Sequence, residues 1–477
     1  MATRYATTST RTARRIGLYL TLAVLVAVAG AAWAQQYNRA YEGTTIRVLD
    51  VARDAHRVGL EFIIPMFEER YGITVEVTEM PFPRMREATV LEMLGRTGRY
   101  DVFSIDVMWL AEYVESGYLE PLYRYINDPQ LHDAEVLDLD GFVPRALSGN
   151  GVHNDMLYAL PISPGMYVQF LRNDLLEEAG IDVPQTEDEL LAAAEVLTKP
   201  EQDVYGITLQ IARGIFFGHQ WLRHLYTFGG EIWDRDWNVV IDSPAGLAAL
   251  DHFLQYKPFT PPGSESFQWD DVSNTFAQGR AAMGEGFSAF MITFEDPEAS
   301  RVVGDVNYTL VPAGPAGTRD ALYGSWAMGV STDSRNKEAA YLFLQYVSGT
   351  EVALEWALRG GQPSRHFVFQ DEEVRAKWPW IGALYDFLMY HANPDFRPRI
   401  PEWAEVAEII GLWGNRAWSG EVSSEEALAG MQREIENVMT TSGYYLPGRT
   451  PPRQHWRDLT YYDRLPSQWN LINLPGQ

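Results

Sequence analysis

The sequence predicts an α/β fold built as two lobes. The chain has 477 residues, which is too long for one simple core and suits two units of ordinary domain size. Short apolar, strand-like runs alternate with helical patterns, an order typical of a parallel sheet with right-handed crossovers. A composition of 46% hydrophobic and 21% charged residues fits a globular protein.

The first 34 residues have the pattern of a secretion signal. A basic start without acids precedes an apolar run at 16–32, and an A-x-A pattern ends at Ala34. We expect cleavage after Ala34. An uncleaved membrane anchor is the alternative, because the run is borderline in length for a bilayer span. The Arg14-Arg15 pair leaves both Sec and twin-arginine export open.

The charge and the missing cysteines exclude several function classes. Without cysteine the chain has no disulfide, thiolate metal site, cysteine nucleophile or lipid anchor on an N-terminal cysteine. The net charge is -26. Removal of the signal would lower it to about -30, and such a field repels nucleic acid and anionic membranes. We therefore expect a periplasmic protein with no nucleic-acid partner.

The first part of the chain alternates strand and helix. Strands are expected at Thr45–Val51, Ile73–Val77 and Tyr100–Ile105, with helices between them near 60–72 and 85–94. Pro65 should kink the first of these helices or mark its true start.

The alternation resumes later in the chain. Thr186 and Ser243 are expected to cap helices, the second with Pro244 at the first helical position. Strands are expected at Tyr205–Gln210, Ala281–Glu285, Val306–Val311 and Trp326–Ser331, and helices at Glu187–Leu197, Gly218–Phe228, Pro244–Tyr256, Lys337–Val347 and Trp403–Trp418.

Seven segments in order carry a family resemblance. They are RYGITVEV (70–77), YDVFSIDVMWLAEYVESGYLEPL (100–122), RNDLLEEAGIDVPQTEDEL (172–190), GGEIWDRDWNVVIDSPAGLAAL (229–250), FAQGRAAMGEGF (276–287), SRNKEAAYLFLQYVSGTE (334–351) and SGEVSSEEAL (419–428). The chain resembles the sugar-binding class of extracellular solute-binding proteins.

The resemblance implies a two-lobed periplasmic-binding-protein fold of type II, with a ligand cleft between lobes joined by crossing strands. The first lobe would take residues 35–158 and 306–366. The second would take 159–305 and 367–465, which leaves 466–477 as a C-terminal tail.

The implied role is the substrate-binding component of an ABC importer. It would be a monomer that captures a sugar or oligosaccharide in the periplasm and delivers it to the membrane permease. A polyol or a glycerol-phosphate-type ligand is the alternative in the same role. A carbohydrate-active enzyme and a chemoreceptor adaptor are further alternatives, although we expect the chain not to be an enzyme.

Candidate ligand contacts were sought at strand ends, because a sugar ring stacks on aromatics while its hydroxyls bind charged and amide groups. Asp106 and Trp109 follow one predicted strand, and their alternatives are a loop cap and a core side chain. Arg53 and Asp54 follow the first strand and could instead cap a helix. Trp326 precedes a strand, after Gly324-Ser325.

The remaining candidates rest mainly on the resemblance. Tyr167 follows the lobe crossing, and Glu285 and Phe287 end a strand where the family places a ligand aromatic. Phe287 stands where tryptophan is more usual. Three more residues fall where the family lines its cleft, with an inter-lobe ion pair open for the arginine and a core position for the tryptophan: Gln362, Arg365 and Trp403.

Motifs for other chemistry were not found. The chain contains no H-E-x-x-H, P-loop, G-x-S-x-G or G-x-G-x-x-G pattern. The nine histidines lack metal-ligand spacing, and DRDWN (234–238) fits a surface turn better than a calcium loop. We therefore expect no cofactor and no metal.

Overall fold

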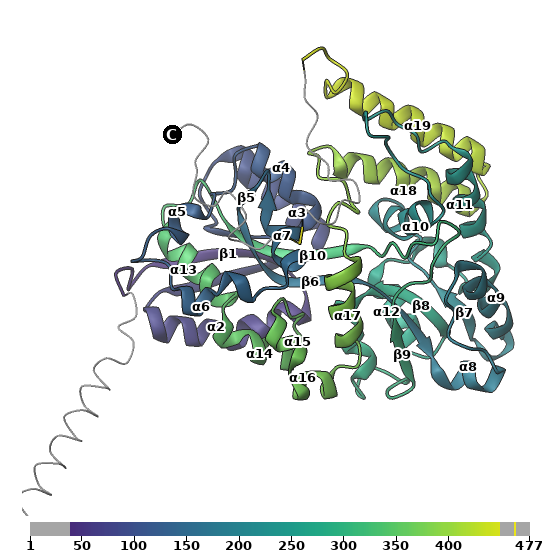
Figure 1. Cartoon of the computed structure of the whole chain (residues 1–477), viewed down its shortest axis with the longest axis horizontal. Coiled ribbons are helices and arrows are strands. Elements are labelled where there is room, and N and C mark those ends of the chain that lie inside the picture. The colour runs from purple at the N-terminus through teal and green to yellow at the C-terminus, as the bar shows by residue number, and fades with distance from the viewer. Residues whose placement is uncertain (1–38, 449–461, 464–477) are drawn as a thin grey trace, which may run out of the picture.

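The computed structural model describes residues 39–448 and 462–463, which form two lobes side by side (Figure 1). The predicted signal peptide and the predicted tail at 466–477 lie outside these residues. Over the described residues, an eight-stranded sheet runs through both lobes in the order β2-β1-β3-β10-β6-β8-β7, with β9 paired to β6. Helices cover the sheet, so the predicted α/β class is confirmed.

The sheet of the first lobe is parallel except at one strand. β1 (Thr45–Val51) pairs in parallel with β2 (Thr74–Met80) and with β3 (Val102–Asp106). β10 (Tyr323–Val330) is antiparallel to β3, and its register sets Trp326 directly opposite Asp106. Pairing between strands far apart in sequence thus brings two of the predicted contact residues together.

One long strand joins the lobes. The first part of β6 (Ala159–Arg172) pairs with β10 in the first lobe. Its second part pairs with β8 (Ala281–Phe287) and β9 (Val306–Thr309), and β7 (Tyr205–Thr208) extends the sheet beyond β8. A short hairpin of β4 (Val152–His153) and β5 (Met156–Leu157) stands apart. β6 is therefore a crossing strand of the kind expected.

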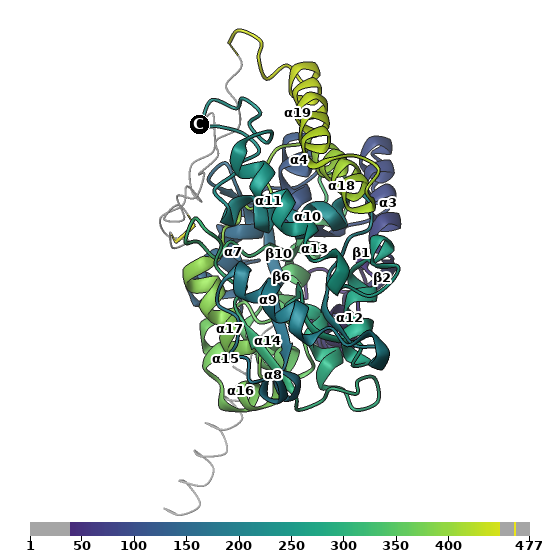
Figure 2. The ribbon, with the colours of Figure 1, turned by 90° about the vertical axis from the view of Figure 1, so that its right-hand side faces the viewer.

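Helices flank the sheet in both lobes. In the second lobe, α10, α11, α18 and α19 gather at one end (Figures 1 and 2). The helices are α2 (Asp54–Tyr71), α3 (Phe82–Gly95), α4 (Leu110–Glu115), α5 (Tyr123–Ile126), α6 (Ala134–Leu137), α7 (Pro144–Gly151), α8 (Asn173–Ala179), α9 (Glu187–Leu197), α10 (Ile215–Thr227), α11 (Pro244–Leu254), α12 (Trp269–Ala277), α13 (Lys337–Val347), α14 (Thr350–Leu358), α15 (His366–Gln370), α16 (Glu372–Lys377), α17 (Ile381–Asp386), α18 (Trp403–Ser419) and α19 (Ser424–Thr441). Within the described ranges, no helix is both long and apolar enough to cross a membrane.

Local sequence signals located many elements well. β1, α9 and α13 have the predicted bounds. Thr186 forms a capping box with Glu189, and the Ser243 side chain accepts a hydrogen bond from the backbone N–H of Gly246. α2 starts eleven residues before Pro65 and continues past it, so Pro65 does not mark the start of the helix.

The lobe boundaries differ from those expected from the resemblance. β9 pairs with the half of β6 that lies in the second lobe, so residues 306–309 belong there. α15 and α16 contact α14, which itself packs on α2, so these helices extend the first lobe past residue 366. These boundaries are set by contacts between segments far apart in the sequence, and a local sequence pattern does not reveal such contacts.

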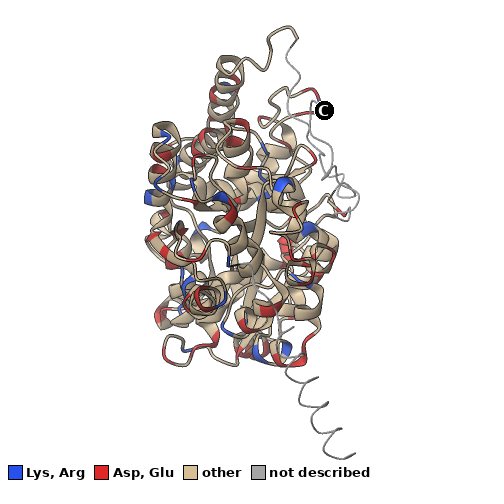
Figure 3. Ribbon diagram, turned by 90° about the vertical axis from the view of Figure 1, so that its left-hand side faces the viewer, with Lys and Arg blue, Asp and Glu red and all other residues tan. Residues whose placement is uncertain are grey.

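Residues near the C-terminus contact α7 of the first lobe and the segment that follows α17. The Tyr462 hydroxyl donates to Asp395 Oδ1 at 2.6 Å. The Arg145 side chain on α7 donates to both carboxylate oxygens of Asp463, at 2.7 and 3.1 Å. Acidic and basic residues are interspersed on the face of the molecule seen in Figure 3, in line with a charge that is scattered along the chain.

Candidate ligand-binding site

A cavity lies between the lobes, where β6 and β10 run side by side. It encloses about 370 Å³, open solvent included. Ligands of open α/β sheets bind beyond the carboxyl ends of strands, and residues just after β1, at the end of β3 and at the end of β8 line this space. The lining residues are Arg53, Asp106, Ser163, Gly165, Trp269, Phe287, Ala289, Gly324, Trp326 and Arg397.

Aromatic rings from both lobes meet around the cavity. The guanidinium of Arg53 lies 5.4 Å from the ring centre of Trp326 on β10 and 5.8 Å from that of Trp269 on α12. Phe82 on α3 contacts Trp269 edge to face, with ring centres 5.3 Å apart. Because these contacts join residues of different lobes, the lobes are closed on each other at this point.

Strand β10 leaves room for an aromatic side chain of the second lobe. A Cβ atom at Gly324 would lie 2.2 Å from the Phe287 ring. Glycine at this position therefore allows the ring to pack against β10, where Phe287 is only 7% exposed.

The polar side of the cavity is an ion pair. Arg397 Nη2 lies 3.0 Å from Asp106 Oδ1 and also donates to the carbonyl of Tyr323 at 3.1 Å. Asp106 Oδ1 accepts a hydrogen bond from the backbone N–H of Met108 at 3.2 Å. Asp106 thus caps the short helical turn and also lines the cavity.

Arg397 has a donor left over. The side chain is 2% exposed, and burial lowers the pKa of the guanidinium, an effect that Asp106 opposes. Among the described residues, its Nε–H has no hydrogen-bond partner. A buried donor without a partner costs free energy, so this N–H is suited to a ligand oxygen.

Glu285 lies beside the cavity. It lines an adjoining space of about 240 Å³, which shares Trp269 and Phe287 with the first. Its carboxylate accepts hydrogen bonds from Gln220 at 2.7 Å and from Arg223 at 2.9 Å. Burial raises the pKa of Glu285 to about 7, although Arg223 acts in the opposite direction.

Two other predicted residues, Trp109 and Tyr167, lie behind the aromatic residues that line the cavity. The ring of Trp109 stacks on Phe82 with centres 4.9 Å apart, and it meets Trp326 edge to face at 5.7 Å. Tyr167 packs edge to face on Phe287 at 4.7 Å, and its hydroxyl bonds to Gln210. Both side chains are buried, so they support the lining aromatics.

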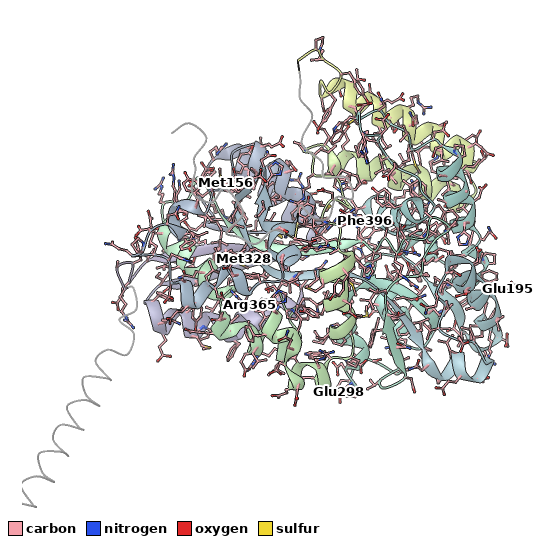
Figure 4. The ribbon with its side chains drawn as sticks, in the orientation of Figure 1. Met156, Glu195, Glu298, Met328, Arg365 and Phe396 are labelled. Atoms are coloured by element: carbon pink, nitrogen blue, oxygen red, sulfur yellow. The ribbon has the colours of Figure 1, made fainter. Side chains whose placement is uncertain are left out.

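The remaining predicted residues lie apart from the lining. Arg365 is buried inside the first lobe, where it donates to the backbone carbonyls of Ser348 and Asp138 at 3.1 and 2.9 Å. Its acidic neighbour Asp138 lies in the same lobe, so Arg365 does not form the inter-lobe ion pair that the sequence left open. Figure 4 shows Arg365 within that lobe, whereas Phe396, next to Arg397, lies near the junction.

Gln362 and Trp403 are buried away from the cavity, and Trp403 is the core residue of the alternative prediction. Asp54 begins α2, and its side chain lies outside the described atoms. Arg53 precedes α2, but its side chain makes no capping hydrogen bond within the described residues, and it lines the cavity instead.

The sequence reading missed Trp269, Arg397 and Ser163. Trp269 is the first residue of α12, and the residue-based candidates were side chains at strand ends. Arg397 stands between Phe396 and Pro398 in a segment without periodicity. A signal that could have found Trp269 is an aromatic directly after a helix cap, since helix starts in α/β folds also face the ligand edge of the sheet.

Comparisons with known proteins identify the family. The family model described as bacterial extracellular solute-binding protein matches residues 53–354. A ribitol-bound ABC transporter solute-binding protein of Agrobacterium radiobacter has a similar structure, with a TM-score of 0.78, 27% identity, and coverage of 83% of this chain and 99% of that one.

Two relatives match by sequence. A probable amino-acid ABC transporter periplasmic-binding protein of Sinorhizobium fredii is 24% identical over 86% of this chain and 93% of its own length. A mannitol-binding protein of Pseudomonas aeruginosa is 23% identical over 84% and 95%. The family match spans more than half of the chain and agrees with the two-lobed fold. The chain therefore belongs to the bacterial extracellular solute-binding proteins.

Proposed function

We propose that this chain is the periplasmic solute-binding component of an ABC importer and that its ligand is a monosaccharide or a linear polyol. The observation that carries the proposal is the cavity itself, with aromatic walls from both lobes and one buried arginine N–H without a partner in the described structure. Aromatic faces pack against C–H groups, and charged and N–H groups bind hydroxyls.

The size of the cavity favours a small ligand. The guanidinium of Arg53 on one lobe lies 5.8 Å from the ring centre of Trp269 on the other, so little space separates the two walls. A long oligosaccharide would require the lobes to close less far. Relatives and structural neighbours named for mannitol and ribitol support a polyol.

The mechanism follows from the position of the cavity. A ligand that contacts Trp326 and Asp106 on one lobe and Trp269 and Phe287 on the other stabilises the closed form over an open form. The closed lobes would then dock on the membrane permease, and reopening would release the ligand. The chain would act as a monomer after signal cleavage at Ala34.

We also propose that the cavity performs no turnover. Two acids would be needed for glycoside hydrolysis. Asp106 is paired with Arg397, and Glu285 is held by Gln220 and Arg223, so both carboxylates are occupied by protein partners.

An amino acid is the second candidate. The name of the Sinorhizobium relative favours it, and Arg53 and Asp106 offer one group of each charge. Asp106 is already paired with Arg397, however, so Arg53 could bind the carboxylate of an amino acid but, among the described residues, no unpaired lining carboxylate is left for its ammonium group.

The test is thermal unfolding of residues 35–477 against monosaccharides, oligosaccharides, linear polyols, phosphorylated glycerols and amino acids. A ligand at a hundredfold over its dissociation constant should add about 2.7 kcal/mol of stability. A shift confined to polyols or monosaccharides supports the proposal, and product analysis by mass spectrometry should find the ligand intact. A shift confined to amino acids or long oligosaccharides contradicts the proposed ligand.

A further inference from the structure

Three helices of the second lobe bring a carboxylate and two histidines together, away from the cavity. Glu187 is the first residue of α9, His224 lies in α10, and His252 lies in α11. One possible ligand atom from each of the three lies within 4.8 Å of the other two. All three side chains are buried, with exposed fractions of 1%, 0% and 7%.

The histidine nitrogens of this cluster make no hydrogen bonds with the described residues. Both ring nitrogens of His224 and both of His252 are buried and without a hydrogen bond among the described residues. His224 Nε2 lies 3.1 Å from Glu187 Oε2, yet the geometry of the pair is not that of a hydrogen bond. Both Nε2 atoms have a carboxylate oxygen within 3.5 Å, but the two Nδ1 atoms have no partner in the described residues, so the protein does not fully satisfy these buried histidines.

The separation fits two ligands of one metal ion. Zinc binds imidazole nitrogen and carboxylate oxygen at about 2.0–2.2 Å in a tetrahedral arrangement, which sets neighbouring ligand atoms about 3.3 Å apart. The pair of His224 Nε2 and Glu187 Oε2 is close to that spacing. His252 would need a small movement of its side chain to close the third bond.

The local charge also favours a cation. Arg223 is buried between Glu187 and Glu285, so one guanidinium faces two carboxylates. Asp188 adds a third carboxylate, with Oδ1 at 3.5 Å from His252 Nε2.

We propose that Glu187, His224 and His252 bind one divalent transition-metal ion such as Zn²⁺. Two imidazoles and a carboxylate are a donor set that suits this class of ion. Asp188 or a water would complete the coordination. The ion would fasten the start of α9 to α10 and α11, so the role is structural.

The sequence predicted no metal because its nine histidines lack metal-ligand spacing, and the three residues of this cluster are 37 and 28 positions apart. Histidine spacing along the chain cannot reveal a site formed by the packing of three helices. The competing explanation is a pair of neutral core histidines packed on aromatics, since His224 contacts Phe253 at 4.8 Å and His252 contacts Phe228 at 5.0 Å between ring centres.

The experiment is metal analysis of the full mature chain, stripped with a chelator, dialysed against Zn²⁺ and passed through a desalting column. Inductively coupled plasma mass spectrometry should find one zinc per chain. The variant His252→Asn should lose the ion or bind it more than about tenfold more weakly. The matched control His366→Asn, which alters a half-buried histidine in the first lobe, should keep it.

A second readout protects the test against misfolding. Co²⁺ added to the stripped wild-type chain should give the visible absorption of a tetrahedral nitrogen–oxygen site, and Zn²⁺ should displace it. Circular dichroism would confirm that His252→Asn is folded. Absence of bound ion and of the cobalt band in wild type overturns the proposal, as does equal zinc uptake by wild type and folded His252→Asn.

Discussion

Two buried arginine–carboxylate groups in this molecule have different partners. Arg223 in the second lobe is bonded to Glu187 and Glu285 and lies between them. Arg397 at the junction pairs with Asp106 and Tyr323 but keeps one N–H that is unpaired among the described residues. Arg223 uses its donors within the protein. Arg397 lines a cavity and keeps one unpaired donor among the described residues. We expect this difference to separate Arg223, a structural arginine, from Arg397, the arginine proposed to bind the ligand, and substitutions of the two residues test it.

The largest effect should come from the structural group. Arg223→Met would leave two buried carboxylates without their cation, and we expect a loss of about 3–5 kcal/mol in the free energy of unfolding by urea denaturation. The matched control is Arg280→Met, since Arg280 makes a bidentate pair with Asp203 on the surface. It should cost at most about 1 kcal/mol. Equal losses would remove the basis of the comparison.

A substitution in the cavity wall should weaken ligand binding, in addition to any effect on stability. Trp326→Ala removes a wall that meets Arg53 and Trp109, and we expect the ligand found by the panel to bind at least about 2 kcal/mol more weakly. Trp413→Ala on α18, whose ring contacts Arg416, is the control and should leave the affinity unchanged. Titration calorimetry on folded variants measures both. An unchanged affinity in Trp326→Ala would place the ligand elsewhere.

The two carboxylates on Arg223 should respond to pH in opposite directions. The pKa of Glu285 is raised to about 7 by burial, so the folded state holds a proton that the unfolded state releases at lower pH. Its stabilising contribution is full below the unfolded pKa and is lost as the pH rises through about 7. The pKa of Glu187 is instead held well below its usual range, chiefly by Arg223 against the cost of burial, so its contribution is lost in acid.

Unfolding in urea between pH 5 and pH 8, with a chelator present, checks this sign. We expect the free energy of unfolding to fall with rising pH more steeply in wild type than in Glu285→Gln, which cannot titrate at that position. Parallel curves for the two proteins would show that Glu285 is ionised throughout.

A smaller effect should come from the contact between Tyr462 and Asp395. Tyr462→Phe removes the 2.6 Å hydrogen bond to Asp395 but keeps the buried ring. We expect a loss of about 0.5–1.5 kcal/mol in stability with no change in ligand affinity. Tyr445→Phe, at a more exposed hydroxyl bonded to the carbonyl of Trp237, should cost less. An altered affinity in Tyr462→Phe would show that this contact influences the closure of the lobes.

The sequence predicted the elements whose signals are local. α9 has a capping box and β1 has a short apolar run, and both have the expected bounds. β6 was seen only as a crossing, because Pro161 and Pro164 lack the N–H groups of a regular strand. Its pairing with β10 on one side and β8 on the other is a tertiary property.

Four predicted contact residues line the cavity, three of them at or just after the end of a strand and Trp326 within β10. These four are Arg53, Asp106, Phe287 and Trp326. Arg365 was a candidate by residue type, but it donates to the backbone carbonyls of Ser348 and of Asp138, and the second comes from a segment far away in sequence. Arg397 was missed for the same reason, since only the folded chain shows which donor is left without a partner.

The central claim is that the ligand binds between the lobes and is contacted by Arg397. The most direct test is titration calorimetry of the panel's ligand against Arg397→Met and Arg365→Met, two buried arginines that both donate to backbone carbonyls. Arg397→Met should bind more weakly by about 1.5–3 kcal/mol, the worth of a hydrogen bond to a charged group, whereas Arg365→Met should lose stability and keep the wild-type affinity. Wild-type affinity in Arg397→Met, or a loss confined to Arg365→Met, would contradict the account.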